Sequence, residues 1–256
     1  RFDPEDGHMY AFGADPMPPY LTYYVISPEG EVLEAEVIPM EVPLMMHDFA
    51  ITENHAVFFF SPAVYHAMEA MGGGMDPVVW EPERGTRIGV MPRDGGVDAM
   101  RYFEVPNCFA FHFVNAYESG DALVLEGASA EKLLSGLGIG DNYEGLPNFP
   151  TRWTMNLKTG QTRTEQFSDR GVEMCQIDLR RTGRKHRHAY FLHYEGSNKV
   201  TNWENLLRID VETGAECLHV YGRGQVSSEV IHIPDPGSDR EEDGYLVSYV
   251  FNPERD

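Results

Sequence analysis

A strand-like stretch with a histidine near its beginning, followed by a short turn and a second apolar run, constrains the fold of this chain most. It covers residues 45–60, where Thr52-Glu53-Asn54 separates the first run from the strongly apolar run Ala56 to Phe60. Two β-prone runs joined by a short polar turn predict a β-hairpin, and His47 lies in its first strand.

The same plan returns three times along the chain. The strand expected over Cys108 to Glu118 carries His112, and later strands carry Glu173 and Glu229 at the corresponding position. The steps between these four polar positions are 65, 61 and 56 residues. A loose repeat of about sixty residues needs an architecture that repeats one small sheet.

Turns with glycine or acidic centres separate the other strand-like runs, as at Ser27-Pro28-Glu29-Gly30 and Val211-Glu212-Thr213-Gly214. Glycine supplies positive φ, and proline favours the start of a turn. Short antiparallel strands with a long internal period predict an all-β chain and a β-propeller. Since a blade usually takes ~40–50 residues, we expect loop or helix insertions on the top face.

Two segments look different from strands. Residues 62–75 predict a short amphipathic helix, which serves either for packing or as an apolar lip at a substrate mouth or a membrane surface. Residues 128–143 mix helix formers with glycines. Their glycines do not follow a strand and lack a Gly-Lys-Ser/Thr ending, so the pattern does not indicate a phosphate-binding loop.

Charge and composition restrict the partners. The 256 residues carry a net charge of −21, which argues against nucleic acid because phosphate binding needs clustered Lys and Arg. The basic run at 180–188 is the exception, and we interpret it as a solvated loop. The three cysteines lack metal-type spacing and predict buried free thiols in a reducing, cytoplasmic compartment. No apolar run approaches ~18 residues, so no spanning helix is expected.

The ends of the sequence indicate an internal piece of a longer protein. Residue 1 is Arg, residues 1–10 open in the middle of a hairpin, and residues 249–256 stop where a strand enters a turn. We therefore expect residues 1–256 to form one domain, a β-propeller portion truncated at both ends.

The repeated polar positions suggest a site. In a propeller the innermost strand of each blade faces the central channel, so His47 and His112 would converge there. A buried imidazole is costly unless it is hydrogen-bonded or ligates a metal, and neutral imidazole suits iron, zinc or copper. Glu173 and Glu229 could orient the rings. Taken singly, each of these residues is more often an ordinary core histidine or ion-paired glutamate. The remaining histidines in and beside outer strands are assigned structural roles.

Three stretches carry a resemblance to a known family. They are Met46-His47-Asp48-Phe49-Ala50-Ile51-Thr52-Glu53-Asn54, the run from Pro106 to Glu118, and Ser228 to Pro234 followed by Glu242-Asp243-Gly244-Tyr245-Leu246. Together they resemble the carotenoid cleavage oxygenase family, which includes carotenoid, apocarotenoid and stilbene dioxygenases and the retinal-pigment isomerohydrolase. The resemblance implies a seven-bladed β-propeller, of which this chain would hold about four to five blades.

The resemblance also implies a metal centre. Family members hold a non-haem Fe(II) with four histidines, three of them backed by glutamates. His47 would be the second ligand and His112 the third, with Glu173 behind His112 and Glu229 behind the fourth histidine. The first and fourth histidines would lie outside this chain, before Arg1 and after Asp256, so the piece alone is expected to bind iron poorly and to be inactive.

One local departure from the family pattern concerns Glu173. The family often has Glu-Phe-Pro-Arg-Ile there, whereas this chain has Glu173-Met174-Cys175-Gln176-Ile177. The loss of the proline puts the backbone shape at this position in question.

The expected activity of the full-length parent is oxidative cleavage of a conjugated carbon–carbon double bond in a carotenoid or apocarotenoid by O₂. The aromatic side chains Phe49, Phe109 and Phe111 are candidates for an apolar substrate wall, although core packing is the alternative for each. The rival hypotheses are a stilbenoid-cleaving dioxygenase, with isomerohydrolase chemistry more distant, and a non-catalytic propeller that serves as a scaffold. A membrane-surface contact through residues 62–75 is a further expectation.

Overall fold

The computed structural model of the chain describes residues 1–66, 71, 77–133, 146–194, 205–222 and 224–255. Four antiparallel sheets of three or four strands follow one another in chain order. They are β1 (Met9–Ala14), β2 (Leu21–Ile26) and β3 (Val32–Val37); β4 (Ala50–Ile51), β5 (His55–Phe60), β8 (Thr86–Pro92) and β9 (Arg101–Val105); β10 (Phe109–Ser119), β11 (Ala122–Ala130), β12 (Phe149–Asn156) and β13 (Thr162–Gln166); and β14 (Val172–Gln176), β15 (His188–His193), β16 (Asn205–Asp210) and β17 (Glu216–Val220).

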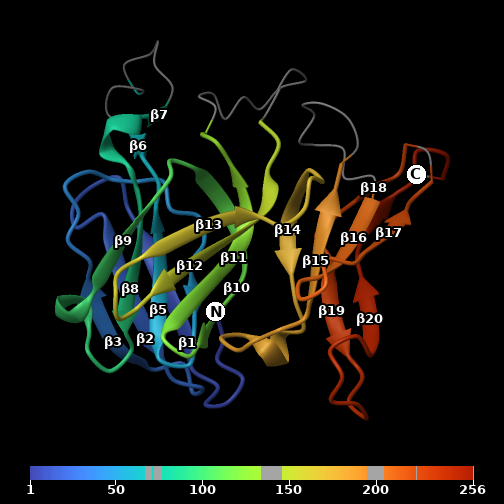
Figure 1. Ribbon diagram of the computed structural model, residues 1–256, viewed down its shortest axis with the longest axis horizontal. Coiled ribbons are helices and arrows are strands. Elements are labelled where there is room, and N and C mark those ends of the chain that lie inside the picture. Colours follow the sequence, from blue (N-terminus) through green and yellow to red (C-terminus); the bar gives the residue numbers. More distant parts are fainter. Residues whose placement is uncertain (67–70, 72–76, 134–145, 195–204, 223, 256) are drawn as a thin grey trace.

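Shorter elements complete the described part of the chain. Three two-stranded pairs and three 3₁₀ turns lie in the connections of the second and fourth sheets or after the fourth sheet. Figure 1 shows the sheets side by side in chain order, from β1–β3 at one side to β19 and β20 at the other. The pairs are β6 (Ala63–Tyr65) with β7 (Val78–Trp80), β18 (Val226–Ser227) with β21 (Val250–Phe251), and β19 (Ile231–Pro234) with β20 (Gly244–Val247); the 3₁₀ turns are η1 (Pro82–Arg84), η2 (Val97–Ala99) and η3 (Leu179–Arg181).

The apolar run of β5 is buried on both faces, which explains its continuous hydrophobic sequence. Because side chains alternate along a strand, Phe58 packs toward the first sheet with Tyr23, while Phe59 packs toward the third sheet with Trp153. A third apolar cluster, which includes Phe191, lies between the third and fourth sheets. Burying one such side chain contributes about 1.5–3 kcal/mol. The cores therefore lie between consecutive sheets and hold them face to face.

The all-β prediction is confirmed, and consecutive sheets packed face to face are the arrangement expected of propeller blades. Four sheets followed by two small pairs are consistent with four to five blades. The number of blades in the whole protein, and the treatment of 1–256 as one truncated domain, stay predictions.

Three local predictions differ from the structure. Residues 63–65 form β6, not the start of a helix, because Ala63 to Tyr65 pair with β7; most of the expected helix, 67–70 and 72–76, lies outside the described residues. Residues 128–130 belong to β11, and 134–145 are not described. The first strand of the initial hairpin begins only at Ala50, so His47 precedes the strand.

The prediction of a solvated basic loop at 180–188 was wrong in part. His186 is 1% exposed, and Arg184 donates to Asp3 at 3.2 Å, so the segment packs against the beginning of the chain. Carboxylates from other segments pair with the cationic side chains of residues 180–188, and this pairing lets the segment pack against the rest of the protein.

Of the three thiols, Cys108 is buried but Cys217 is exposed, so the expectation of buried cysteines holds only in part.

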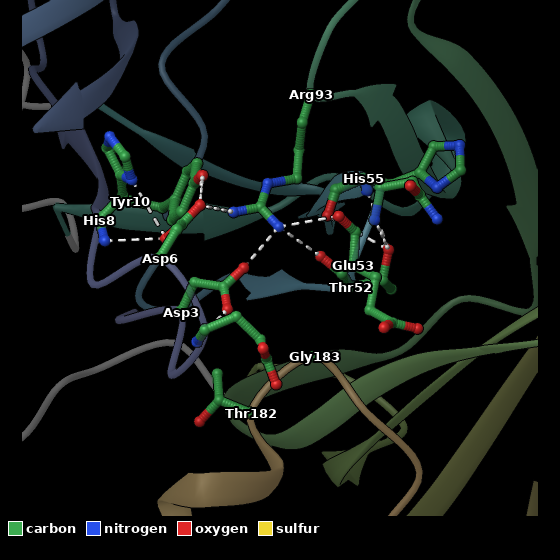
Figure 2. A network of polar contacts seen from close by, with 12 residues as sticks. Asp3, Asp6, His8, Tyr10, Thr52, Glu53, His55, Arg93, Thr182 and Gly183 are labelled. Carbon is green, nitrogen blue, oxygen red and sulfur yellow. Dashed lines mark hydrogen bonds and ion pairs between the residues drawn. The ribbon is translucent and has the colours of Figure 1, made fainter. Parts of the chain in front are cut away.

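Arg93 joins the first sheet to the turn before β5 (Figure 2). Its Nη1 donates to Asp3 Oδ2 at 2.7 Å and to the carbonyl oxygens of Thr52 and Glu53 at 3.1 and 2.9 Å. The guanidinium lies 4.1 Å from the centre of the Tyr10 ring. The planar guanidinium thus serves several acceptors and an aromatic face together, which only arginine can do.

No helix in the described residues is long and apolar enough to cross a membrane.

Glu126 is a fully buried carboxylate between the third and fourth sheets. It accepts from Arg152 Nε at 2.5 Å and lies 3.1 Å from His186 Nε2. Burial opposes the charged form, but His186 and Arg152 outweigh it and hold the pKa of Glu126 below its usual 4.5. A carboxylate with a lowered folded-state pKa stabilises the fold above its unfolded pKa and loses this contribution as pH falls through the folded pKa.

We therefore expect the substitution Glu126→Gln to destabilise the protein at pH 7 by about 3–5 kcal/mol, because it leaves Arg152 and His186 without their buried anion. Acidification below pH 4.5 should then lower the free energy of unfolding less in the variant than in the wild type. Urea unfolding at pH 7 and pH 4 measures both effects. The matched control is Glu165→Gln, which removes the more exposed partner of Arg152. An equal loss in both variants would contradict the assignment.

Gly127 lies opposite an irregular part of β10, where the pairing with β11 shifts register between Ala110 and Asn115. A Cβ atom at position 127 would lie 2.9 Å from both His112 O and Phe113 Cδ1. The backbone carbonyl cannot move aside without displacing His112. Only glycine therefore allows this close approach.

The substitution Gly127→Ala is expected to lower the free energy of unfolding by about 1–3 kcal/mol through this overlap. Gly13→Ala is the control, since a Cβ there meets only Tyr24 at an ordinary 3.5 Å. Both glycines lie in strands, so the backbone effect of the methyl group is shared. Thermal unfolding of the two variants compares them, and equal midpoints would show that the close approach to His112 does not matter.

Candidate metal centre

His112 lies on β10, the first strand of the third sheet, and its ring is held by a carboxylate from the next sheet. Its Nδ1 is 2.6 Å from Glu173 Oε2. Burial disfavours the charged imidazole, but the hydrogen bond and the charge of Glu173 outweigh it and raise the pKa of His112. With Nδ1 engaged, Nε2 is the ring nitrogen left for another partner.

Glu173 lies on β14, the first strand of the fourth sheet, and only 3% of it is exposed. Besides His112, it accepts from the backbone N–H of Met174 at 2.9 Å and from Asn148 Nδ2 at 3.1 Å. Met174 has a φ of +53°, and the pairing of β14 with β15 shifts register after Glu173. The backbone irregularity turns the N–H of Met174 toward the carboxylate. Both oxygens of Glu173 are thus fixed.

His47 lies in the segment just before β4, and its ring faces that of His112. The two ring centres are 4.9 Å apart and their planes are almost perpendicular, at 87°. The ring of Phe111 also packs edge to face against His47, with the ring centres 5.5 Å apart. His47 keeps substantial solvent exposure, yet its partial burial and the charge of His112 lower its pKa. The structure therefore brings together the two histidines singled out from the repeat.

Glu229 lies in the exposed loop between β18 and β19. Within the described residues its carboxylate makes no hydrogen bond, but its negative charge counteracts the lowering of the pKa of His47 and adds to the raising of the pKa of His112. Glu229 thus lies near enough for its charge to act on both rings, without a hydrogen bond to either. Its predicted role behind a further histidine stays a prediction.

The three aromatic residues proposed as a substrate wall have different surroundings. Phe49 is 4% exposed and stacks on Phe58 at 5.5 Å in the core between the first two sheets. Phe109 is 2% exposed and meets Phe111 edge to face at 4.6 Å. Phe111 contacts His47 and is only partly buried. Of the three, Phe111 is best placed to contact a molecule bound beside the histidines.

Sequence reasoning missed three residues that hold this cluster. Asn148 fixes Glu173, and Asp48 and Arg1 connect the backbone next to His47 with that next to His112. Asp48 could have been noticed as a carboxylate directly after a predicted site histidine. Nothing in the sequence near Asn148 indicates its role, because it comes from a different connection of the chain.

Other histidines pair with carboxylates away from this cluster. His55 Nδ1 lies 2.9 Å from Glu118, and His66 Nε2 lies 2.8 Å from Glu81. These pairs agree with the structural roles assigned to them. His232 differs, since it is 4% exposed and neither ring nitrogen has a hydrogen-bond partner among the described residues.

The donor set suits a metal that prefers neutral imidazole. One ring is oriented by a buried carboxylate, an arrangement common behind metal-binding histidines. Within the described residues, no group of three or more His, Cys, Asp or Glu side chains is arranged to hold a metal ion. That His47 and His112 are two members of a larger ligand set stays a prediction.

Comparisons with known proteins show that the chain is similar to parts of several oxygenases. Carotenoid 9,10(9',10')-cleavage dioxygenase 1 of Arabidopsis thaliana is 35% identical over 266 residues, covering 98% of this chain and 49% of that protein. Isoeugenol monooxygenase of Pseudomonas putida is 29% identical over 270 residues, covering 98% of this chain and 56% of that protein. The crystal structure of Pseudomonas brassicacearum lignostilbene dioxygenase superimposes with a TM-score of 0.86 at 25% identity, covering 98% of this chain and 56% of that one.

The chain spans about half the length of the curated relatives it matches. The family described as retinal pigment epithelial membrane protein matches residues 1–256, the whole of the sequence. The all-β sheets agree with the match over the full chain, and the chain belongs to this family of carotenoid cleavage oxygenases.

Proposed function

We propose that the full-length protein containing this chain is a non-haem Fe(II) dioxygenase that cleaves a conjugated double bond of a carotenoid or apocarotenoid. The overall change is balanced, since one alkene and one O₂ give two carbonyl products. The observation that carries the proposal is the hydrogen bond from partly buried His112 to buried Glu173, beside the perpendicular ring of His47. The similarity to a carotenoid cleavage dioxygenase over nearly the whole chain supports it.

In this proposal His47 and His112 are two of the iron ligands. Fe(II), when bound, would supply the activation of O₂ that the side chains of this chain cannot provide. Glu173 holds Nδ1 of His112, so that Nε2 is the nitrogen presented to the metal. Asn148 and the N–H of Met174 keep the carboxylate in place.

An apolar cluster beside the histidines would accept the polyene. Phe111 packs against His47 and against the buried cluster that contains Met45, Phe109 and Val78. Such a surface excludes water and offers aromatic faces to electron-poor carbon atoms of the substrate. Phe111 is the residue we assign to the substrate wall, while Phe49 and Phe109 support it from the core.

A second candidate activity is cleavage of a stilbenoid by the same centre. The similarities to a lignostilbene dioxygenase and an isoeugenol monooxygenase favour it. The two activities differ in the substrate's polar ends, not in the iron site. A non-catalytic scaffold is the alternative from another class, and it requires that the full-length protein bind no metal. A membrane-surface contact near residues 62–75 and a cytoplasmic location stay predictions.

The activity can be tested with the purified full-length protein, Fe(II), O₂ and an apocarotenal. We expect shorter aldehydes, loss of activity on removal of the metal by a chelator, and recovery on addition of Fe(II). His112→Ala should lose activity, and a hydroxystilbene run in parallel distinguishes the two substrate classes. If iron-loaded protein gives no aldehyde from either substrate, the dioxygenase proposal is wrong; if the protein retains no metal, the scaffold is favoured.

Glu173→Gln tests the orienting carboxylate. The amide has one acceptor oxygen, whereas Glu173 accepts from His112, Met174 and Asn148. We expect the affinity for Fe(II) to fall about 10–100-fold, the usual effect of losing a partner of a metal ligand. The control is Glu216→Gln, whose carboxylate accepts from Ser168 and Arg170 on the outer part of the fourth sheet. Metal titration of both variants decides, and an unchanged affinity in Glu173→Gln would argue against its role.

A further inference from the structure

The segment that carries His47 lacks the support that a strand would give it. Residues 46–49 belong to no strand, and β4 begins only at Ala50. His112, in contrast, lies within the eleven-residue strand β10. Pairing with β11 on both sides of the register shift therefore holds the segment of His112, whereas no strand pairing holds His47, and the position of His47 needs another source.

The side chain of Asp48 connects the two histidine-bearing segments. Its Oδ2 accepts from the backbone N–H of Phe113 at 2.9 Å, and its Oδ1 accepts from the N–H of Phe49 at 2.8 Å. Asp48 follows His47 in the sequence, and Phe113 follows His112. One carboxylate thus ties together the residues adjacent to both rings.

Arg1 closes this connection from a third segment. Its Nη2 donates to Asp48 Oδ2 at 2.5 Å and to the carbonyl oxygen of Phe113 at 2.9 Å, and its Nε donates to the carbonyl oxygen of Phe49 at 2.9 Å. The fork of the guanidinium reaches both backbones, which a lysine ammonium could not do with the same fixed geometry. The side chains of Arg1 and Asp48 are 22% and 21% exposed, so water screens them only partly.

We propose that Asp48, locked by Arg1, is a positioning residue that sets the separation and angle of the His47 and His112 rings. The metal-ligand role of the two rings rests on the proposed function, whereas the geometric role of Asp48 does not. A metal centre requires its ligands to be held within about 0.5 Å of the productive geometry. The Asp48–Arg1 pair holds residues 46–49, which belong to no strand, against the β10 segment that follows His112.

The substitution Asp48→Asn separates this role from simple packing. Asparagine has the same size but only one acceptor oxygen, so its NH₂ group must face either the N–H of Phe49 or the donors at Phe113 and Arg1. In either orientation the NH₂ group faces a hydrogen-bond donor, and the hydrogen bond to that donor is lost. Arg1→Lys is the second variant, because it keeps the charge and loses the fork.

Glu118→Gln is the matched control. Glu118 also joins the second and third sheets through a carboxylate, accepting from Thr52 Oγ1, Asn54 Nδ2 and His55 Nδ1. It lies at the other end of β10, six residues after His112. A variant that only loosens the contact between the two sheets should behave like Glu118→Gln.

The experiment compares the full-length wild type and the three variants by Co(II) titration, by the visible spectrum of bound Co(II) and by thermal unfolding. We expect Asp48→Asn and Arg1→Lys to bind Co(II) about 10–100-fold more weakly than the wild type and to give an altered spectrum. Glu118→Gln should match the wild type in both metal measurements, even if its thermal midpoint falls. Spectra and affinities of Asp48→Asn equal to those of the wild type would overturn the proposal.

A structural measurement without metal distinguishes failure of the positioning role of Asp48 from failure of the proposed function. Crystal structures of the metal-free wild type and Asp48→Asn should show the ring centres near 4.9 Å in the former and displaced in the latter. A wild type that binds no Co(II) would sink the proposed function, yet the ring displacement would still test Asp48. Rings that stay in place in Asp48→Asn would refute the positioning role whatever the metal result.

Discussion

The packing of one sheet against the next is the constraint on which the other features of this molecule depend. β5 is apolar on both faces because it contributes to the cores on either side of its sheet. Once the sheets are stacked in this way, the first strands of successive sheets come close together. His112 and Glu173 lie on β10 and β14, the first strands of their sheets, and His47 lies just before β4, the first strand of the second sheet. The site is therefore a consequence of how the cores are filled.

Within the site, each polar group is held in place by contacts from a neighbouring group. Glu173 is buried and holds His112, while Asn148 and an irregular turn of the backbone at Met174 hold Glu173. His47 meets the ring of His112 from the neighbouring sheet. Each group has few ways to move, because its neighbour is itself fixed. Such successive support is what a metal ligand needs, and the mere proximity of two histidines would not provide it.

Much of this arrangement could be predicted from the sequence, and the part that could not has physical causes. The alternation of apolar and polar residues, together with the turn residues, predicted the strands. The spacing of about sixty residues predicted that His47, His112 and Glu173 lie close together. The β6 strand was missed because Ala63, Val64 and Tyr65 fit a helix as well as a strand, and only pairing with β7 decides between them. Asn148, Asp48 and Arg1 were missed because their partners lie far away in the sequence. The register shift at Met174 also depends on the neighbouring strand, although the departure from the family pattern drew attention to it.

The ion pair between Arg184 and Asp3 joins residues 181 positions apart. Arg93 donates to the same carboxylate, so Asp3 lies between cations from two different sheets. During synthesis on the ribosome, the first sheet can form long before Arg184 has emerged. Until then Asp3 and Arg93 can pair, but the packing of the 180–188 segment against the beginning of the chain must wait. Contacts of such long range slow folding, and a nascent chain of this protein would spend that interval with the surface around Asp3 still open to chaperones.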